Sequence, residues 1–189
     1  MAPTPGSQAV LFSGHMIDRQ DRDTPRFPTE KVPAAANRIA CTVDDLEPAA
    51  DDLAVSGAAC GGDLLFADTW LSRGCRLEVV LARPISEYLA ESVRFAGAEW
   101  EQRFEWVVNH PSVRVEALPS GTERPHQQAA RRMLDVAVAV PDRELVGVFL
   151  WDRRPGDGPG GTAALVDAVS DAGGRVVVID PADLDLAAT

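Results

Sequence analysis

The sequence has 189 residues, of which 46% are hydrophobic and 25% charged, and its formal net charge is −11. This length and composition are typical of one medium-sized globular domain with a hydrophobic core. The negative charge disfavours binding to nucleic acid or to an anionic membrane surface, and the only lysine, Lys31, lies outside any glycine-rich loop, which excludes a P-loop nucleoside triphosphatase.

The first half of the chain predicts strands that alternate with helices. A short apolar run at 9–13 predicts a buried strand, and the polar segment 18–28 is long enough to predict a functional loop. Apolar residues at helical spacing predict a helix over 33–46. The other predicted elements of this half are a strand at 53–56, a helix at 63–73 and a strand at 76–82.

The second half continues this alternation. An apolar stripe predicts helix over 84–108, where Gly97 marks a place to divide, and the more polar strand at 113–117 suits a sheet edge. The remaining predicted elements are a helix at 123–140, a strongly apolar strand at 145–151, a helix at 162–172 and a strand at 175–179.

This order of elements predicts an α/β fold. Apolar strands between amphipathic helices indicate a Rossmann-like three-layer sandwich, with a mostly parallel sheet of about five or six strands and helices on both faces. We expect a single domain with a core over about 9–180 and a frayed tail over 181–189. Right-handed crossovers place the loops that follow the strands at one edge of the sheet, where ligands bind in such folds.

Three loops at that edge are candidates for a binding site: residues 13–16, 56–63 and 156–162. Glycines between a strand and a helix let the backbone approach a ligand, and free N–H groups at the helix start attract an anion. Gly61 and Gly62 precede one predicted helix, and Gly160, Gly161 and Thr162 precede another. The alternative is that these glycines only allow tight turns.

Several side chains in these loops have two interpretations. Cys60 at a helix start is either a nucleophile or a small buried residue, and the second is favoured. His15 is either an acid or base or a loop-capping residue, and Asp63 is either a catalytic acid or a helix N-terminal charge. Trp151 either stacks on a base or packs in the core.

The loop at 18–28 carries three arginines, Arg19, Arg22 and Arg26, among Asp18, Asp21 and Asp23. These guanidinium groups either bind phosphate or carboxylate or form ion pairs with the interleaved aspartates. Three aromatic residues of the helix predicted over 84–108 also have two interpretations. Trp100, Phe104 and Trp106 are expected in the core or at a dimer interface rather than in a cofactor-binding motif.

Cysteine and histidine usage predicts no metal site. The three cysteines are widely spaced, with no C-x-x-C pair and no histidine at ligand spacing. Together with the lack of a signal peptide or a long apolar run, this favours a reducing cytoplasm. No motif for a resident cofactor is evident.

Three blocks of sequence resemble the SLOG superfamily, Rossmann-like domains named for the DprA/Smf proteins and the Lonely Guy enzymes. They are S-G-H-M-I-D at 13–18, A-A-C-G-G-D-L-L-F-A at 58–67 and W-D-x(4)-D-G-P-G-G-T-A at 151–163. The blocks are similar to a bacterial branch that is often fused to signalling modules. The resemblance covers roughly residues 10–180.

The resemblance implies a nucleotide-related ligand between two glycine loops, with a homodimer and a signalling or effector protein as partners. Gly57, Gly61 and Gly62 match the first glycine block, and Gly160, Gly161 and Thr162 match the phosphate-binding block. The Lonely Guy motif P-G-G-x-G-T-x-x-E has a catalytic glutamate, where this chain has Leu165. That departure weakens the expectation of N-glycosidic hydrolysis.

The leading hypothesis is therefore a sensor domain that binds a nucleotide-derived ligand. The first alternative is a nucleoside-monophosphate phosphoribohydrolase, with His15, Asp63, Asp152 and Asp167 as candidate acids and bases. The second is an interaction domain whose ancestral site has decayed. The residues expected to contact the ligand are Ser13, Gly14, His15, Arg26, Ser56, Gly57, Cys60, Gly61, Gly62, Asp63, Trp151, Asp152, Gly160, Gly161 and Thr162.

Overall fold

A six-stranded parallel sheet forms the centre of the molecule in the computed structural model, which describes residues 7–139, 142–154 and 161–184. The strand order is β4-β3-β2-β1-β5-β6, and every pairing is parallel. The strands are β1 (Gln8–Gly14), β2 (Leu53–Ser56), β3 (Arg76–Leu81), β4 (Val113–Ala117), β5 (Glu144–Leu150) and β6 (Arg175–Ile179). The prediction of a parallel α/β sandwich is confirmed, and β4 lies at an edge as its polar sequence indicated.

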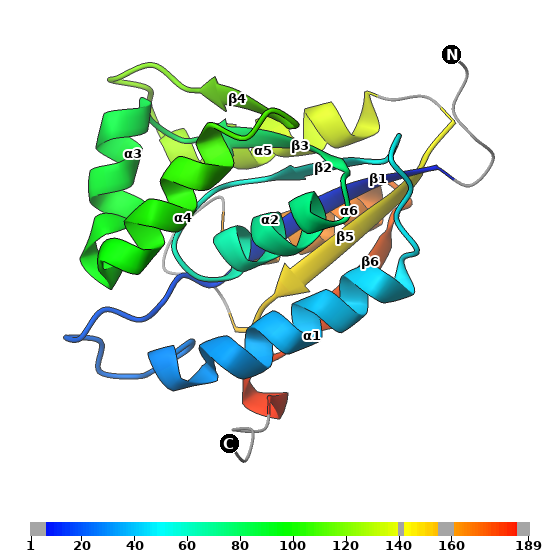
Figure 1. Cartoon of the computed structure of the whole chain (residues 1–189). Coiled ribbons are helices and arrows are strands. Elements are labelled where there is room, and N and C mark those ends of the chain that lie inside the picture. The colour runs from blue at the N-terminus through cyan, green and yellow to red at the C-terminus, as the bar shows by residue number, and fades with distance from the viewer. Residues whose placement is uncertain (1–6, 140–141, 155–160, 185–189) are drawn as a thin grey trace.

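Helices cover both faces of this sheet (Figure 1). They are α1 (Val32–Asp45), α2 (Gly62–Ser72), α3 (Ile85–Ser92), α4 (Ala98–Val108), α5 (Pro125–Val138) and α6 (Thr162–Asp171). Helices α1, α2 and α4 pack on one another on one face, and α5 and α6 lie on the other. This is the three-layer arrangement expected from the alternation of strands and helices.

The topology has a switch point between β1 and β5. From β1 the chain adds β2, β3 and β4 on one side, and then returns to place β5 on the other side of β1. Because right-handed crossovers in opposite directions put their helices on opposite faces, α5 and α6 lie across the sheet from α1 and α2. A crevice opens at the carboxyl ends of strands at such a point.

The centre of the sheet is apolar because β1 and β5 are buried between the two helical layers. Leu11 and Phe12 of β1 and Val148 of β5 are all 0% exposed. The Phe12 ring stacks on Phe66 of α2 with 4.4 Å between ring centroids, which joins the sheet to that helix. The short hydrophobic runs of these strands are therefore explained by burial on both faces.

Two sequence predictions about irregular segments have different outcomes. The helical segment 84–108 is divided, because Gly97 has a φ of +109° between a short 3-10 turn and α4. The prediction of a frayed tail over 181–189 is wrong for its first residues. Pro181–Asp183 form a 3-10 turn in which Asp180 accepts a hydrogen bond from Ala182 N, and Leu184 is buried. Residues 185–189 of that tail lie outside the described residues.

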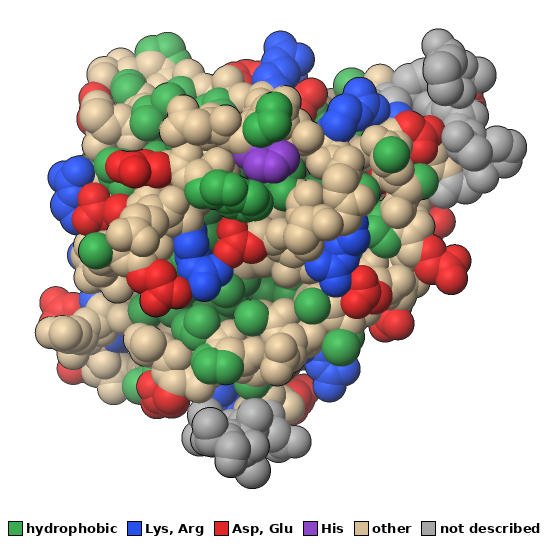
Figure 2. Space-filling view, in the orientation of Figure 1, with side chains coloured by type: hydrophobic (Ala, Val, Ile, Leu, Met, Phe, Trp, Pro, Cys, Tyr) green, Lys and Arg blue, Asp and Glu red, His purple; other side chains and the backbone are tan. Residues whose placement is uncertain are grey.

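No helix in the described part of the chain is long and apolar enough to cross a membrane. The face covered by α1, α2 and α4 carries acidic and basic side chains mixed together, as Figure 2 shows. No broad basic area is visible on this face.

Candidate functional site

Two neighbouring cavities lie at the carboxyl ends of the central strands. The first, of about 510 Å³, is lined by the 18–26 segment, His15, Trp151 and the start of α6, and is called the loop pocket below. The second, of about 380 Å³, lies against the ends of β1, β2 and β3 and is called the sheet pocket. Gly14, Met16, Gly161 and Thr162 line both cavities, so the two pockets meet at the start of α6.

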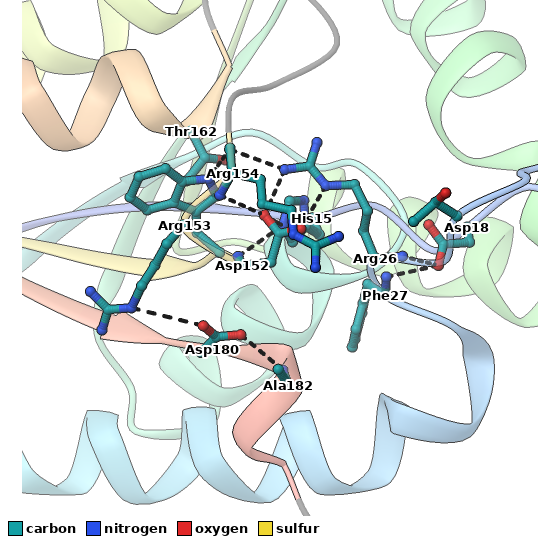
Figure 3. A network of polar contacts seen from close by, with 12 residues as sticks. His15, Asp18, Arg26, Phe27, Asp152, Arg153, Arg154, Thr162, Asp180 and Ala182 are labelled. Atoms are coloured by element: carbon teal, nitrogen blue, oxygen red, sulfur yellow. Dashed lines mark hydrogen bonds and ion pairs between the residues drawn. The ribbon is translucent and has the colours of Figure 1, made fainter.

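A network of polar contacts includes His15 and Arg26, which line the loop pocket, and Asp152 beside them (Figure 3). Arg26 donates two hydrogen bonds to the Asp152 carboxylate, from Nε at 2.9 Å and from Nη2 at 2.6 Å. His15 Nε2 lies 3.1 Å from both the backbone N and Oδ1 of Asp152. The network connects β1, β5 and the 18–28 loop, and brings together three residues that the sequence analysis named.

The pKa values in this network follow from its charges. Burial opposes the ionised form of Asp152, but the Arg26 hydrogen bonds, the Arg154 N–H and the neighbouring charges hold the pKa of this carboxyl well below its usual range. Burial and then the Arg26 charge lower the pKa of His15, although Asp152 acts in the opposite direction. A neutral His15 accepts the backbone N–H of Asp152 and acts as the loop-capping residue of the second interpretation.

The 18–28 loop is held against the sheet edge at both ends. Asp18 Oδ2 accepts hydrogen bonds from the backbone N of Arg26 and of Phe27, each at 2.8 Å, and the Phe27 side chain is 0% exposed. At the other end Arg19 donates to Glu91 O and lies 3.8 Å from the centroid of the Phe95 ring. The loop therefore forms an ordered wall of the pocket.

The arginines of this loop divide between the two interpretations. Arg22 Nε lies 3.4 Å from Asp18 Oδ1, so ion pairing inside the loop is confirmed for Arg22, whereas Arg26 pairs with Asp152, which lies outside the loop. Arg19 and Arg22 also line the loop pocket, where they contribute positive charge. Asp18 and Asp21 line the same cavity and partly neutralise this positive charge.

The second glycine loop packs against the first loop and leaves Gly62 no free N–H. Gly62 N donates to His15 O at 3.0 Å, and Ile17 N donates to Cys60 O at 3.1 Å. A Cβ on Gly61 would lie 2.6 Å from His15 O, so glycine is required for this close approach. The N–H of Gly62 is therefore already used within the chain and is not available to an anion, which favours the tight-turn interpretation at this residue.

Cys60 is a buried residue and not an activated thiol. Its side chain is 0% exposed, and burial raises the pKa of the thiol to about 12. A thiol with that pKa is protonated at neutral pH, which contradicts the nucleophile interpretation.

The third glycine loop lines both pockets where it is described. Gly161 precedes the first turn of α6, and Thr162 Oγ1 lies 3.1 Å from Ser13 Oγ at the end of β1. Gly160 lies outside the described residues. Ser13, Gly161 and Thr162, which the sequence analysis named as ligand contacts, are thus brought together at the ends of the first and third loops.

Asp63 lies in the first turn of α2, as the helix N-terminal interpretation held, and it also lines the sheet pocket. Oδ1 accepts a hydrogen bond from Gly14 N at 3.1 Å, and Oδ2 accepts one from Ala59 N at 3.3 Å. Burial raises the pKa of Asp63 to about 7, although both N–H groups act in the opposite direction. The carboxyl group therefore connects the first two loops and titrates near neutral pH.

Other residues named from the sequence lie around the pockets or away from them. Trp151 lines the loop pocket and its indole Nε1 donates to Arg154 O at 2.8 Å, whereas Gly57 lines the sheet pocket. Ser56 is 0% exposed and lines neither pocket, and Asp167 is exposed on α6. Trp100 and Phe104 are core residues, as one interpretation held, while Trp106 is 47% exposed.

Several residues of the pockets were missed in the sequence. Tyr88, Ser92, His126 and Met133 line the sheet pocket, and Phe95 lines the loop pocket. His126 lies in the first turn of α5, and the rule that helices between parallel strands begin at the carboxyl edge could have identified it. Tyr88 lies in the first turn of α3, the helix that follows β3, so the same rule could have identified it.

Within residues 7–139, 142–154 and 161–184, no cluster of three or more His, Cys, Asp and Glu side chains could hold a metal ion. Comparisons with models of known protein families and with curated proteins found no match. The resemblance to the SLOG superfamily stays a prediction.

Proposed function

We propose that this chain binds a small phosphate-bearing ligand derived from a nucleotide, at the carboxyl edge of the sheet between β1 and β5. The observation that carries the proposal is the meeting of the two pockets at Gly161 and Thr162, at the topological switch point. Ligands of open parallel sheets bind in this position because the strand ends and helix starts converge there.

The start of α6 suits the phosphate. Its first N–H groups lack acceptors within the helix and carry the positive end of the helix dipole, and Thr162 adds a hydroxyl group. Arg19 and Arg22 line the same cavity and supply positive charge from the facing loop. The phosphate would therefore lie between α6 and the 18–28 loop.

Binding is favoured over turnover because the candidate catalytic groups of the loop pocket are occupied by one another. Asp152 is paired with Arg26, and the Nε2 of a neutral His15 accepts a backbone N–H. A ligand in the loop pocket would contact the ordered 18–28 wall directly. Ligand binding could thus be passed to a signalling partner or to a second copy of the chain through that wall, as in a cytoplasmic sensor domain.

Isothermal titration calorimetry against nucleoside mono- and diphosphates tests this function. We expect binding by the wild type and a Kd about tenfold higher for Thr162→Val, since one hydrogen bond to phosphate is removed. Thr42→Val is the matched control, because Thr42 lies on α1 and its hydroxyl donates to Arg38 O. Absence of binding at millimolar concentration, or equal affinity in Thr162→Val, would contradict the proposal.

One observation favours the alternative function of a hydrolase. The carboxyl group of Asp63 lines the sheet pocket, and its pKa is about 7. Such a group could act as a general acid near neutral pH. Chromatography of the same nucleotides after incubation would show free base if the bond to the sugar is cleaved. Release that is lost in Asp63→Asn would establish the enzyme, and intact nucleotides would exclude it.

The decayed-site alternative requires that the pockets be filled by side chains. The loop at Gly61 and Gly62 is indeed packed against residues 15–17, but both cavities at Gly161 and Thr162 are open among the described residues. This difference between the two glycine loops favours a site that uses one of them.

A further inference from the structure

Tyr88 has a buried hydroxyl group whose proton is not used by any described residue. The side chain is 6% exposed, and its oxygen accepts a hydrogen bond from Ala58 N at 3.3 Å. A tyrosine hydroxyl donates as well as accepts, and a buried donor without an acceptor is costly. Burial raises the pKa of Tyr88, so the proton is retained at neutral pH. Because Tyr88 lines the sheet pocket, an acceptor is expected from whatever occupies that pocket.

Asp63 supplies the opposite chemistry beside it. Each carboxylate oxygen accepts one backbone N–H and keeps a further lone pair, and the side chain is 8% exposed. A Cβ on Gly57 would lie 2.6 Å from Asp63 Oδ2 and 3.3 Å from the Tyr88 oxygen. The absence of a side chain at Gly57 therefore leaves open the space that the acceptor and the donor both border.

The rest of the lining of the sheet pocket is mostly apolar, and its other polar side chains are those of Ser13, Ser92, His126 and Thr162. Val80 and Ala82 lie at the end of β3, and Ala129, Met133 and Leu165 come from α5 and α6. At about 380 Å³ the cavity falls within the range of about 300–1,000 Å³ that is usual for small-molecule sites. Apolar walls with a donor and an acceptor at one end suit a flat ring with a polar edge.

We propose that the sheet pocket binds the heteroaromatic base of the ligand, with Asp63 accepting a hydrogen bond from the edge of the ring and Tyr88 donating one to it. The proposal rests on the proposed function, because Thr162 in the shared wall would hold the phosphate of the same molecule. A purine edge with an amino group beside a ring nitrogen matches this pair, as it matches the amide of Asn or Gln in nucleic-acid recognition.

This assignment differs from base stacking on Trp151. Trp151 lines the loop pocket and not the sheet pocket, whereas Tyr88 and Asp63 line the sheet pocket and keep a donor and a lone pair for a ligand. A purely apolar occupant would cover both polar groups without satisfying their hydrogen bonds, which is unfavourable. The polar edge of the pocket thus selects a heterocycle over a hydrocarbon.

Four probes separate the ring from the phosphate: adenosine, adenosine monophosphate, purine riboside monophosphate, which lacks the amino group, and ribose 5-phosphate, which lacks the ring. By calorimetry we expect adenosine to bind the wild type, and adenosine monophosphate to bind about tenfold more tightly than purine riboside monophosphate. Ribose 5-phosphate should bind most weakly of the phosphorylated probes.

Two variants test the residues. Tyr88→Phe should raise the Kd of adenosine and of both nucleotides about tenfold and leave ribose 5-phosphate unchanged. Asp63→Asn should remove most of the preference for the amino group. Asp167→Asn is the matched control, since Asp167 is exposed on α6 and lines neither pocket. Circular dichroism and a melting curve establish that each variant is folded before its affinity is compared.

The outcomes distinguish this inference from the proposed function. If ribose 5-phosphate and adenosine monophosphate bind equally and adenosine does not bind, the ring site is wrong and the phosphate site stands. If adenosine binds and its affinity falls in Tyr88→Phe while phosphate adds nothing, the ring site stands and the phosphate site is wrong. If the wild type binds none of the four probes, both are overturned.

Discussion

At the scale of single residues, Asp63 is a buried carboxyl group of the candidate site whose pKa is strongly raised by burial. Its carboxyl group is buried, connects Gly14 to Ala59 through backbone N–H groups, and has a pKa of about 7. Its neighbours Cys60 and Tyr88 both have raised pKa values, so they stay neutral when Asp63 titrates. Its protonation should therefore be measurable as a contribution to stability.

The pH dependence of stability should have a definite sign. Because the pKa of Asp63 is about 7 in the folded protein and 3.8 as its ordinary value, the folded state holds a proton that the unfolded chain has released between these pH values. We expect the free energy of unfolding to fall as pH rises from about 4 to about 7, by up to about 4 kcal/mol from this group.

Urea unfolding at a series of pH values checks this expectation. The difference in unfolding free energy between the wild type and Asp63→Asn isolates the contribution of Asp63 from the other carboxylates. That difference should decrease between about pH 4 and pH 7 and be constant above. A difference that stays the same over the whole range would show that the carboxyl group is not perturbed.

At the scale of elements, the site depends on two loops that pack against each other. The segment at 15–17 pairs with Cys60 and Gly62 through backbone hydrogen bonds, and Met16 and Gly61 form an antiparallel bridge. This pairing holds the end of β1 against the start of α2 and forms the wall between the pockets. It requires a residue without a Cβ at Gly61, where φ is +113°.

Gly61→Ala should destabilise the protein by about 2–4 kcal/mol, since the added methyl group meets His15 O as well as an unfavourable φ. Gly97→Ala is the matched control: its φ is +109°, but no atom lies within 4 Å of the added Cβ, so it should cost about 1–2 kcal/mol. Chemical denaturation of both variants measures the difference. Equal losses would mean that the close contact between the loops contributes nothing.

At the scale of the whole molecule, the sheet predicts the order in which backbone amides are protected. Strands β1 and β5 are paired on both sides and their central residues are buried, whereas β4 is an edge strand whose residues are partly exposed or exposed. Local opening costs least where few buried contacts are lost.

Hydrogen exchange followed by mass spectrometry should therefore show the slowest exchange in peptides that cover β1 and β5 and markedly faster exchange in β4. The partly exposed strand β6 at the other edge should be intermediate, because Ile179 and the turn after it are packed. Exchange in β4 as slow as in β1 would indicate that another surface covers this edge.

The alternation of apolar runs and amphipathic stripes was enough to predict the parallel sheet, because burial on both faces and the helical period are local properties of the sequence. The sequence also predicted that the helical segment 84–108 divides at Gly97 and that the strand at 113–117 lies at an edge of the sheet, and the structure confirms both. The fold also located the carboxyl edge, so Ser13, His15, Asp152 and Thr162 could be named together before their contacts were known.

Only the tertiary structure decided which groups remain for a ligand. The Gly62 N–H is taken by His15 O, Asp152 is taken by Arg26 across 126 residues of sequence, and Cys60 is buried. It also placed Tyr88, in the first turn of α3, at the same pocket as Asp63. Hydrogen bonds and burial between distant segments leave no periodic or compositional signal, so the partners of a polar group are determined by packing and not by its neighbours in the chain.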